Sequence, residues 1–296
     1  MIFIAGASGF VGSHLVDHLL SHGQSLTCLA RSEKAVAALA AKGVAVVRGD
    51  ITDPSSLKGA ISSGDFIIHL VGIIEEKGDA TFQRIHVDGT RNLVSEALRA
   101  GAGHFFYQSA LGADRTSWSA YQRTKAEAEE LVSRSGLPHT IFRPSLIIGP
   151  GDGFTKKILD MLRLSPVIPI PGSGAAKFQP IGIGDWLTCI SYVIASPEHY
   201  PAIYELGGPE HLTYRKIVET LAQAAGLARR SVPVPMGLVK FGASLLEKVM
   251  SSPPVTPDQL RLLEEDNITR LDAVEENFGF RPRRFEEVVR GFVGKE

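Results

Sequence analysis

Apolar runs alternate with amphipathic stretches through the first half of the chain. Ile2 to Ala5 is a short apolar run, and the stretch behind it carries apolar residues at helical spacing. Further strands are expected at 25–30, 44–50, 65–71, 104–110 and 139–144, with helices between them near 34–42, 55–61, 80–100 and 120–135. This order predicts an α/β fold: a doubly wound parallel sheet (Rossmann) covered by helices on both faces.

The alternation of strand and helix patterns ends near Pro150. Proline- and glycine-rich stretches occupy 149–153, 166–174 and 232–237. We therefore predict a dinucleotide-binding domain over 1–150 and a smaller, mixed substrate-binding lid over 151–296. Some late segments, such as a strand at 203–206, are expected to return to the main domain. The apolar stretch 236–250 is predicted to be a core-facing helix, with a lid for a lipophilic substrate or a docking surface as the alternatives.

A glycine-rich turn directly follows the first strand. Its seven residues are Gly6, Ala7, Ser8, Gly9, Phe10, Val11 and Gly12. A strand, such a turn and then a helix let a pyrophosphate approach the free N–H groups at the helix N-terminus, because glycine has no Cβ in the way. The pattern predicts a dinucleotide site, and the alternative is an ordinary strand-to-helix turn.

The ends of the next strands bear on which dinucleotide binds. The second strand ends at Arg31, whose guanidinium suits a 2′-phosphate, and no acid stands there to select a free ribose hydroxyl. We therefore predict NADP(H) rather than NAD(H), with a surface arginine stacking on adenine as the alternative. Asp50 is expected to reach the adenine, or else to cap a turn. The other expected cofactor contacts are Ile51, Leu70, Val71, Gly72, Arg143 and Pro144; Arg143 can equally be an ion-paired strand end.

Composition narrows the class of protein. A net charge of −1 over 296 residues argues against nucleic acid as a partner. Cys28 and Cys189 follow no metal-ligand spacing, so we expect buried thiols in a reducing compartment and no metal site. No apolar run reaches the ~20 residues of a membrane span. With Met1 directly before the first strand, no leader is expected, and the predicted location is cytoplasmic.

A second motif, YQRTK, places Tyr121 and Lys125 four residues apart on one face of a predicted helix. With this motif the chain resembles the extended short-chain dehydrogenase/reductase superfamily. GASGFVG, RGDITD, DFIIHLVG, HVDGTRNLV, YQRTK, FRPSLIIGPGD and ELGGPE follow one another in family order. The resemblance implies that Tyr121 is the general acid/base, and that Lys125 binds the nicotinamide ribose and lowers the pKa of the tyrosine. An ammonium near a phenol favours the phenolate, which agrees with these roles.

Several positions depart from the sugar-nucleotide epimerases of that family. Ala110 stands where those enzymes carry a hydroxyl, and Ser109, one residue earlier, is the remaining catalytic candidate. His86 replaces an asparagine, and Phe178 replaces a phosphate-binding arginine. We predict that His86, Ala110, Phe178 and Gln179 line a substrate pocket more apolar than that of a sugar-nucleotide enzyme.

These departures resemble an atypical subfamily that includes the nucleotide-binding accessory subunit of respiratory complex I and stand-alone bacterial proteins. The leading prediction is an NADP(H)-binding oxidoreductase acting on a carbonyl or quinone-like small molecule. One alternative is a nucleotide-sugar epimerase or dehydratase. The other is a non-catalytic, NADPH-stabilised subunit or assembly factor of a respiratory or quinone pathway. The expected partners are the substrate and either a second copy of the chain or a respiratory-complex protein.

Overall fold

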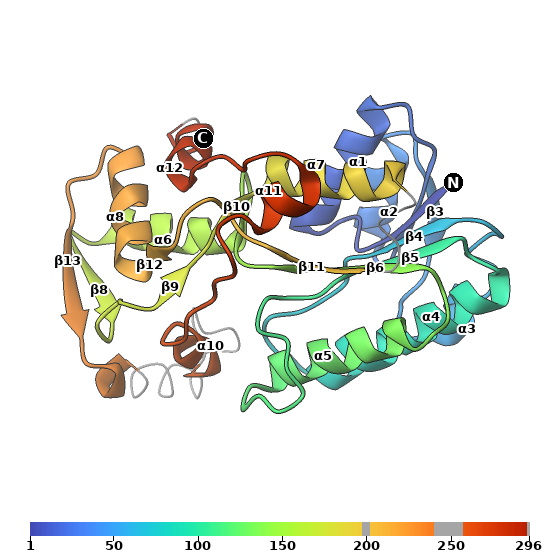
Figure 1. Cartoon of the computed structure of the whole chain (residues 1–296), viewed down its shortest axis with the longest axis horizontal. Helices are drawn as coiled ribbons and strands as arrows, with labels where there is room; N and C mark the ends of the chain where they lie inside the picture. The colour runs from blue at the N-terminus through green and yellow to red at the C-terminus, as the bar shows by residue number, and fades with distance from the viewer. Residues whose placement is uncertain (197–201, 240–256, 295–296) are drawn as a thin grey trace. The chain divides into compact units, whose positions relative to one another are not determined.

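Seven strands form one sheet in the order β11-β6-β5-β4-β1-β2-β3 (Figure 1). The computed structural model describes residues 1–196, 202–239 and 257–294. Strands β1 to β6 pair in parallel, and the predicted doubly wound α/β fold is confirmed. The strands of this sheet are β1 (Ile2–Ala5), β2 (Leu26–Ala30), β3 (Ala45–Arg48), β4 (Phe66–His69), β5 (His104–Gln108), β6 (His139–Pro144) and β11 (Ala202–Leu206).

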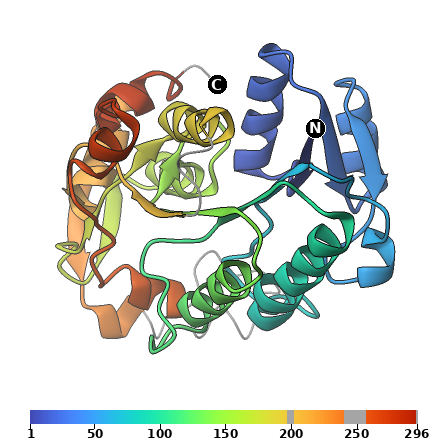
Figure 2. The ribbon, with the colours of Figure 1, turned by 45° about the vertical axis from the view of Figure 1, so that its right-hand side comes forward.

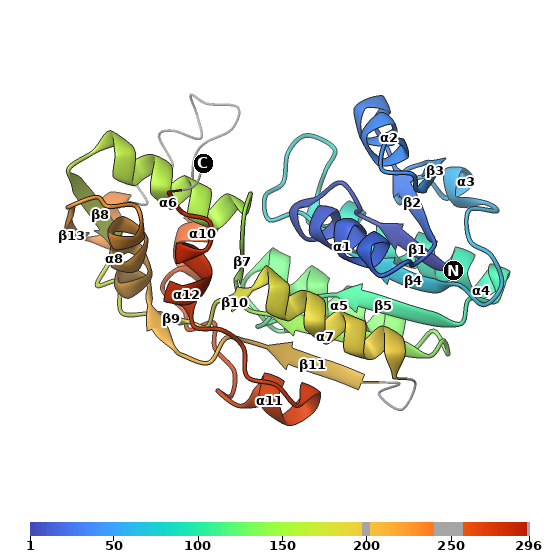
Figure 3. The ribbon, with the colours of Figure 1, turned by 90° about the horizontal axis from the view of Figure 1, so that it is seen from above.

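Helices cover both faces of the sheet. In Figures 1 and 3, α1 (Phe10–Ser21) and α7 (Ile183–Ala195) lie on one face, and α4 (Gly89–Ala100) and α5 (Ala120–Ser133) lie on the other. Figure 2 shows α4 and α5 side by side. The short helices α2 (Glu33–Ala40) and α3 (Pro54–Leu57) flank β3. Under α4 and α5 lies a continuous apolar core that includes Phe3, Ile67, Leu93, Phe105, Tyr107 and Val132.

The predicted long helix at 80–100 is divided in two. A π-helical turn, η1 (Gln83–Asp88), comes first and continues directly into α4. Gly89, where the two meet, lies close to the buried side chain of Ile51. A Cβ at this position would be only 2.5 Å from Ile51 Cδ1. The helix near 55–61 is also shorter than expected, because Pro54 and the capping carboxylate of Asp53 start α3 but it ends at Leu57.

The described chain divides into two compact units. One comprises Met1–Pro144 with Leu187–Tyr204, and the other comprises Ser145–Trp186 with Glu205–Glu296. The second unit has three two-stranded sheets: β7 (Ile147–Ile148) with β10 (Ile181–Gly182), β8 (Val167–Pro171) with β13 (Arg230–Val234), and β9 (Lys177–Phe178) with β12 (Leu212–Thr213). Its helices are α6 (Gly153–Leu164), α8 (Tyr214–Ala224), α10 (Pro257–Leu262), α11 (Ala273–Phe278) and α12 (Phe285–Arg290).

The second unit has its own apolar core, formed largely by α6, α8 and α12. Its fully buried members include Leu162, Ile217, Leu221 and Val289. Side-chain caps start two of these helices: Asp152 accepts from the Thr155 N–H, and Thr213 from the Lys216 N–H. Of the predicted apolar helix at 236–250, residues 240–250 lie outside the described residues.

Two glycines of the first turn allow three segments to meet. Gly6 has a left-handed φ of 97°, and a Cβ there would lie 3.0 Å from the backbone of Leu70 and Val71. A Cβ on Gly12 would lie only 2.1 Å from the Gly6 carbonyl oxygen. The first turn of α1 therefore packs directly against Gly6 and Ala7, and Gly6 in turn packs against the loop after β4.

Gly12→Ala should lower the free energy of unfolding by about 1–3 kcal/mol, because the new methyl overlaps backbone atoms that cannot move aside. Alanine's higher helix propensity opposes this loss only in part. Urea denaturation measures the effect. The matched control is Gly9→Ala, whose Cβ would be 3.4 Å from the Gly6 oxygen; because alanine is a poorer N-cap than glycine, it should lower stability by less than about 1 kcal/mol. Equal losses in both variants would contradict the packing explanation.

Candidate functional site

The turn between β1 and α1 has the features of an anion site. Gly9 is the N-cap residue of α1 and contributes no side-chain cap, and the first turn of the helix contains no acidic residue. The Gly9 N–H donates to the Gly6 carbonyl at 3.1 Å, which closes the turn. The N–H groups that follow and the positive end of the helix dipole suit a pyrophosphate. Ala7 is buried, Ser8 is exposed, and Phe10 and Val11 are partly buried.

Arg31 stands at the end of β2, directly before the N-cap of α2, and its side chain is 74% exposed. Nη1 lies 3.4 Å from Oδ2 of Asp50. Burial raises the pKa of the Asp50 carboxyl, but hydrogen bonds from Thr52 and the nearby Arg31 outweigh it, so the net pKa is lowered. Asp50 thus has the turn-capping geometry given above as the alternative to an adenine contact, since its Oδ1 accepts from both the N–H and the hydroxyl of Thr52.

The loop after β4 connects the glycine turn to a buried lysine. The Leu70 N–H donates to the Ala5 carbonyl, which continues the strand pairing past the end of β4. At Gly72, a Cβ would lie 3.2 Å from Lys125 Nζ and 3.6 Å from His86 Nε2. One short loop therefore contacts Gly6 at one end and faces Lys125 at the other.

Lys125 is 5% exposed and lies on α5, four residues after Tyr121. Its Nζ donates to the Gln108 carbonyl at 2.9 Å and lies 5.0 Å from the centre of the Tyr107 ring. Burial lowers the pKa of Lys125 to about 8, against a smaller opposite effect of Glu129. Burial also raises the pKa of Tyr121 to about 12. The expected lowering of the tyrosine pKa is therefore not found in this structure, where desolvation of the phenol dominates.

His86 is fully buried behind Tyr121, in the π-helical turn. Its Nδ1 is 3.0 Å from the Thr124 hydroxyl, and its Nε2 lies within hydrogen-bond distance of both the N–H and the carbonyl of Ile73. Its ring meets the Tyr121 ring edge to face at 5.5 Å. Burial, with Lys125 nearby, lowers the pKa of His86 to about 3. Both ring nitrogens of His86 are thus occupied and its ring packs against Tyr121, while its place in the substrate pocket stays a prediction.

Ser109 and Ala110 follow β5 at the carboxyl edge of the sheet. Ser109 is 4% exposed, and its hydroxyl has no hydrogen-bond partner among the described residues. Its N–H donates to the Phe142 carbonyl, so the strand pairing extends to this residue. Ala110 is partly exposed. An unpartnered buried hydroxyl at this edge keeps Ser109 as a candidate, although its role stays a prediction.

Arg143 is an ion-paired strand end, the alternative considered from its sequence. Its Nε and Nη2 bind the two carboxylate oxygens of Glu129 at 2.9 and 2.5 Å. This fork connects β6 to α5 and satisfies a carboxylate that is only 6% exposed. Pro144 is buried, and its carbonyl accepts from the Leu111 N–H.

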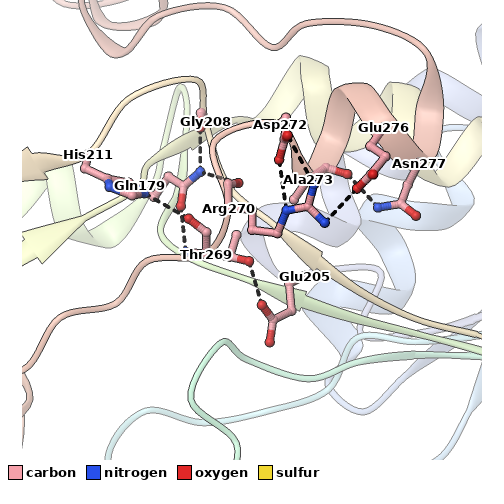
Figure 4. Close-up of polar contacts among 10 residues, drawn as sticks. All are labelled: Gln179, Glu205, Gly208, His211, Thr269, Arg270, Asp272, Ala273, Glu276 and Asn277. Atoms are coloured by element: carbon pink, nitrogen blue, oxygen red, sulfur yellow. Dashed lines mark hydrogen bonds and ion pairs between the residues drawn. The ribbon is translucent and has the colours of Figure 1, made fainter.

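Phe178 and Gln179 lie in the second unit, and both side chains are buried inside it. Phe178 is 4% exposed within the apolar core. Gln179 Nε2 donates to the carbonyls of Gly208 and Arg270, and its Oε1 accepts from the Thr269 N–H (Figure 4). Both ends of the Gln179 amide are therefore bonded to backbone groups, and they connect the segments at Gly208 and 269–270. We do not include Gln179 in the proposed substrate pocket.

Three residues of this site were not predicted from the sequence: Tyr107, Thr124 and Glu129. Tyr107 reads as one more apolar member of β5, and Thr124 and Glu129 read as ordinary helix positions. Only Glu129 has a signal in the sequence, since it lies one helical turn after Lys125. The described residues contain no group of three or more histidine, cysteine or acidic side chains placed to hold a metal ion. No helix among them is long and apolar enough to cross a membrane.

Comparison with known proteins defines the class. Residues 6–158 match the family model described as NAD(P)H-binding, so the chain belongs to this family, within the extended short-chain dehydrogenase/reductase and epimerase proteins. Among curated relatives, a ceramide reductase of Caulobacter vibrioides is 33% identical over 170 residues, which cover 57% of this chain and 53% of the reductase. The chain therefore spans about half of that protein.

Two further proteins match over most of their length. The mitochondrial NADH dehydrogenase (ubiquinone) 1 alpha subcomplex subunit 9 of Dictyostelium discoideum is 28% identical over 92% of this chain and 77% of its own. The crystal structure of an NADPH-dependent quinone oxidoreductase of Escherichia coli, complexed with NADPH, has a TM-score of 0.76 at 21% identity, covering 98% of this chain and 99% of that one. The resemblance drawn from the motifs is thus confirmed at the level of the family.

The buried His86 should make stability depend on pH. Its pKa is about 3 when folded and about 6.5 when unfolded. Between these values the unfolded chain binds a proton that the folded chain does not, so stability is complete above pH ~6.5 and falls as the pH drops. His86→Gln should reduce the slope of unfolding free energy against pH, near pH 5, by about 1.4 kcal/mol per pH unit.

Chemical denaturation at several pH values measures that slope. The matched control is Thr124→Ala, which removes the hydrogen-bond partner of the ring but not the titrating group. It should lower stability by a similar amount at every pH. A slope in His86→Gln equal to that of the wild type would show that His86 carries a proton in the folded protein.

Proposed function

We propose that the protein is an NADP(H)-dependent oxidoreductase that reduces a carbonyl or quinone-like compound. One observation carries the proposal: a single loop, Leu70 to Gly72, contacts the glycine turn and also faces Lys125. A dinucleotide with its pyrophosphate at the start of α1 can thus extend along the sheet edge toward Lys125 and Tyr121. The acid-free helix N-terminus, whose N-cap Gly9 offers no side-chain cap, fits this cofactor.

In the proposed reaction, each residue has a distinct role. The bound cofactor supplies the hydride. Lys125, charged below pH ~8, donates hydrogen bonds to the ribose and holds it in place. Tyr121 donates the proton of its hydroxyl to the carbonyl oxygen of the substrate. Because burial raises its pKa to about 12, the phenol keeps this proton at neutral pH and has it available to donate.

The choice of NADP(H) rests on Arg31. Most of its guanidinium is exposed, and its contact with Asp50 involves Nη1 alone among its nitrogens. The remaining N–H groups can pair with a 2′-phosphate. The type of substrate is inferred from Ala110, which offers no hydroxyl. It also draws on relatives named as reductases of a ceramide and of quinones.

A second candidate function is that of a non-catalytic, NADPH-stabilised subunit. The observation that favours it is the match over 92% of this chain to a protein named as a subunit of NADH dehydrogenase. In that role the same cofactor contacts would stabilise the fold, and Tyr121 would have no substrate to protonate. Nothing in the described geometry favours an epimerase in particular, and Phe178 occupies the interior where such enzymes have a phosphate-binding arginine.

Arg31→Ala should weaken NADPH binding by about 10- to 100-fold, because a charge-assisted pair to a phosphate contributes about 1.5–3 kcal/mol. NADH binding should change by less than about threefold. Titration calorimetry with both nucleotides measures the difference. Arg48→Ala is the matched control, since Arg48 is an exposed arginine at the end of the neighbouring strand and pairs with Glu33. Equal losses for NADPH and NADH would refute the assignment.

Tyr121→Phe should reduce turnover by about 10²- to 10⁴-fold, the usual contribution of a general acid. NADPH affinity should change little, since only the hydroxyl is removed. The assay follows NADPH oxidation with a set of quinones, ketones and aldehydes, and calorimetry gives the affinity. The comparison variant is Lys125→Met, which should weaken NADPH binding as well. A wild type that binds NADPH but reduces none of these compounds would favour the non-catalytic subunit.

A further inference from the structure

Two consecutive residues of β5 hold the ammonium group of Lys125. The ring of Tyr107, itself fully buried, lies under Nζ at 5.0 Å, and the carbonyl of Gln108 accepts a hydrogen bond from Nζ at 2.9 Å. A buried cation is costly unless nearby groups compensate for the lost water. The face of an aromatic ring and a backbone carbonyl both supply negative potential to a cation. Together they form a seat for the ammonium.

The other groups around Lys125 compensate its charge less directly. Glu129, one turn along α5, has both carboxylate oxygens bound by Arg143 of β6. His69 of β4 and His86 of η1 both have a pKa lowered to about 3, chiefly by burial, so they are neutral at pH 7. Burial likewise raises the pKa of the Tyr121 and Tyr107 hydroxyls. None of the ion pairs between described residues includes Lys125, so the Tyr107 ring and the Gln108 carbonyl are its direct partners.

We propose that Tyr107 is a positioning residue: its ring seats the ammonium of Lys125 and sets the upper pH limit for cofactor binding. The proposal rests on the proposed function in one respect, that Lys125 binds the cofactor. Tyr107 is fully buried and is not among the residues proposed to contact the cofactor or the substrate. It acts through Lys125, by keeping the ammonium charged and directed at the loop that contains Gly72.

The expected effect follows from the strength of the contact. Burial lowers the pKa of Lys125 to about 8, and an aromatic ring under the ammonium favours the charged form. Replacing the ring by an aliphatic side chain should therefore lower the pKa of Lys125 by a further ~0.5–1.5 units. Tyr107→Phe keeps the ring and should therefore change the pKa of Lys125 by less than ~0.3 units.

The first measurement needs no cofactor. Carbon-13 NMR of the lysine side chains follows each Cε signal with pH, and Lys125→Met identifies the signal of Lys125 by its loss. In the wild type, the Hε protons should be shifted upfield by the ring of Tyr107. Tyr107→Phe should keep this upfield shift. In Tyr107→Leu and Tyr107→Met the shift should be lost, and Lys125 should titrate at lower pH. Methionine is included because its flexible chain fills the vacated volume better if the leucine variant does not fold.

The second measurement is the dissociation constant of NADPH from pH 6 to 10 by calorimetry. Wild type and Tyr107→Phe should lose affinity with a midpoint near the Lys125 pKa, and the aliphatic variants should lose it at lower pH. Lys125→Met should bind weakly at every pH.

The NMR titration and the calorimetry test the role of Tyr107 and the cofactor role of Lys125 separately. A wild-type affinity that is independent of pH and equal to that of Lys125→Met overturns the cofactor role of Lys125, and with it the proposed function. An unshifted Hε signal in the wild type, or identical Lys125 titration with and without the ring, overturns the role of Tyr107.

Discussion

The close contact between backbone segments at Gly6 and Gly12 determines the arrangement of the site. A side chain at either position would overlap main-chain atoms, of the loop after β4 in one case and of the turn itself in the other. Because these side chains are absent, the backbone can pack closely where β1 ends. Gly6 lies against the loop at Leu70, and Gly12 of α1 lies against Gly6. The free N–H groups of α1 thereby come to the sheet edge where β4 and β5 also end.

Electrostatics in the first unit is organised around one buried cation. The charged groups around Lys125 are compensated elsewhere: the Glu129 carboxylate, which raises the pKa of Lys125, is bound by Arg143, and His69 and His86 are kept neutral by burial. The sheet supplies the compensation through a ring and a carbonyl rather than through an opposite charge. A cation held this way can still pair with a ligand, because no side-chain carboxylate competes for its remaining N–H groups.

The fold and the family could be predicted from local signals. Short apolar runs, the glycine turn and the spacing of Tyr121 and Lys125 each depend on a few neighbouring residues, and both the doubly wound sheet and the family are confirmed. The side-chain partners of the candidate residues could not be predicted in this way, because they depend on contacts between distant segments. His86 is drawn inward by Ile73 and Thr124, and Gln179 is engaged by Gly208, Thr269 and Arg270. No pattern along the chain reports such pairs. The roles of Tyr121, Lys125 and Ser109 stay predictions.

The π-helical turn before α4 has a consequence for how related chains are compared. A π turn accommodates one more residue than an α turn, so the positions before and after it are out of phase by about 100°. His86 lies within this turn and is hydrogen-bonded to Thr124. A chain with one residue fewer between Phe82 and Gly89 would form a regular helix and direct a different side chain at the same place. In an alignment, the length of this segment is therefore as informative as the identity of its residues.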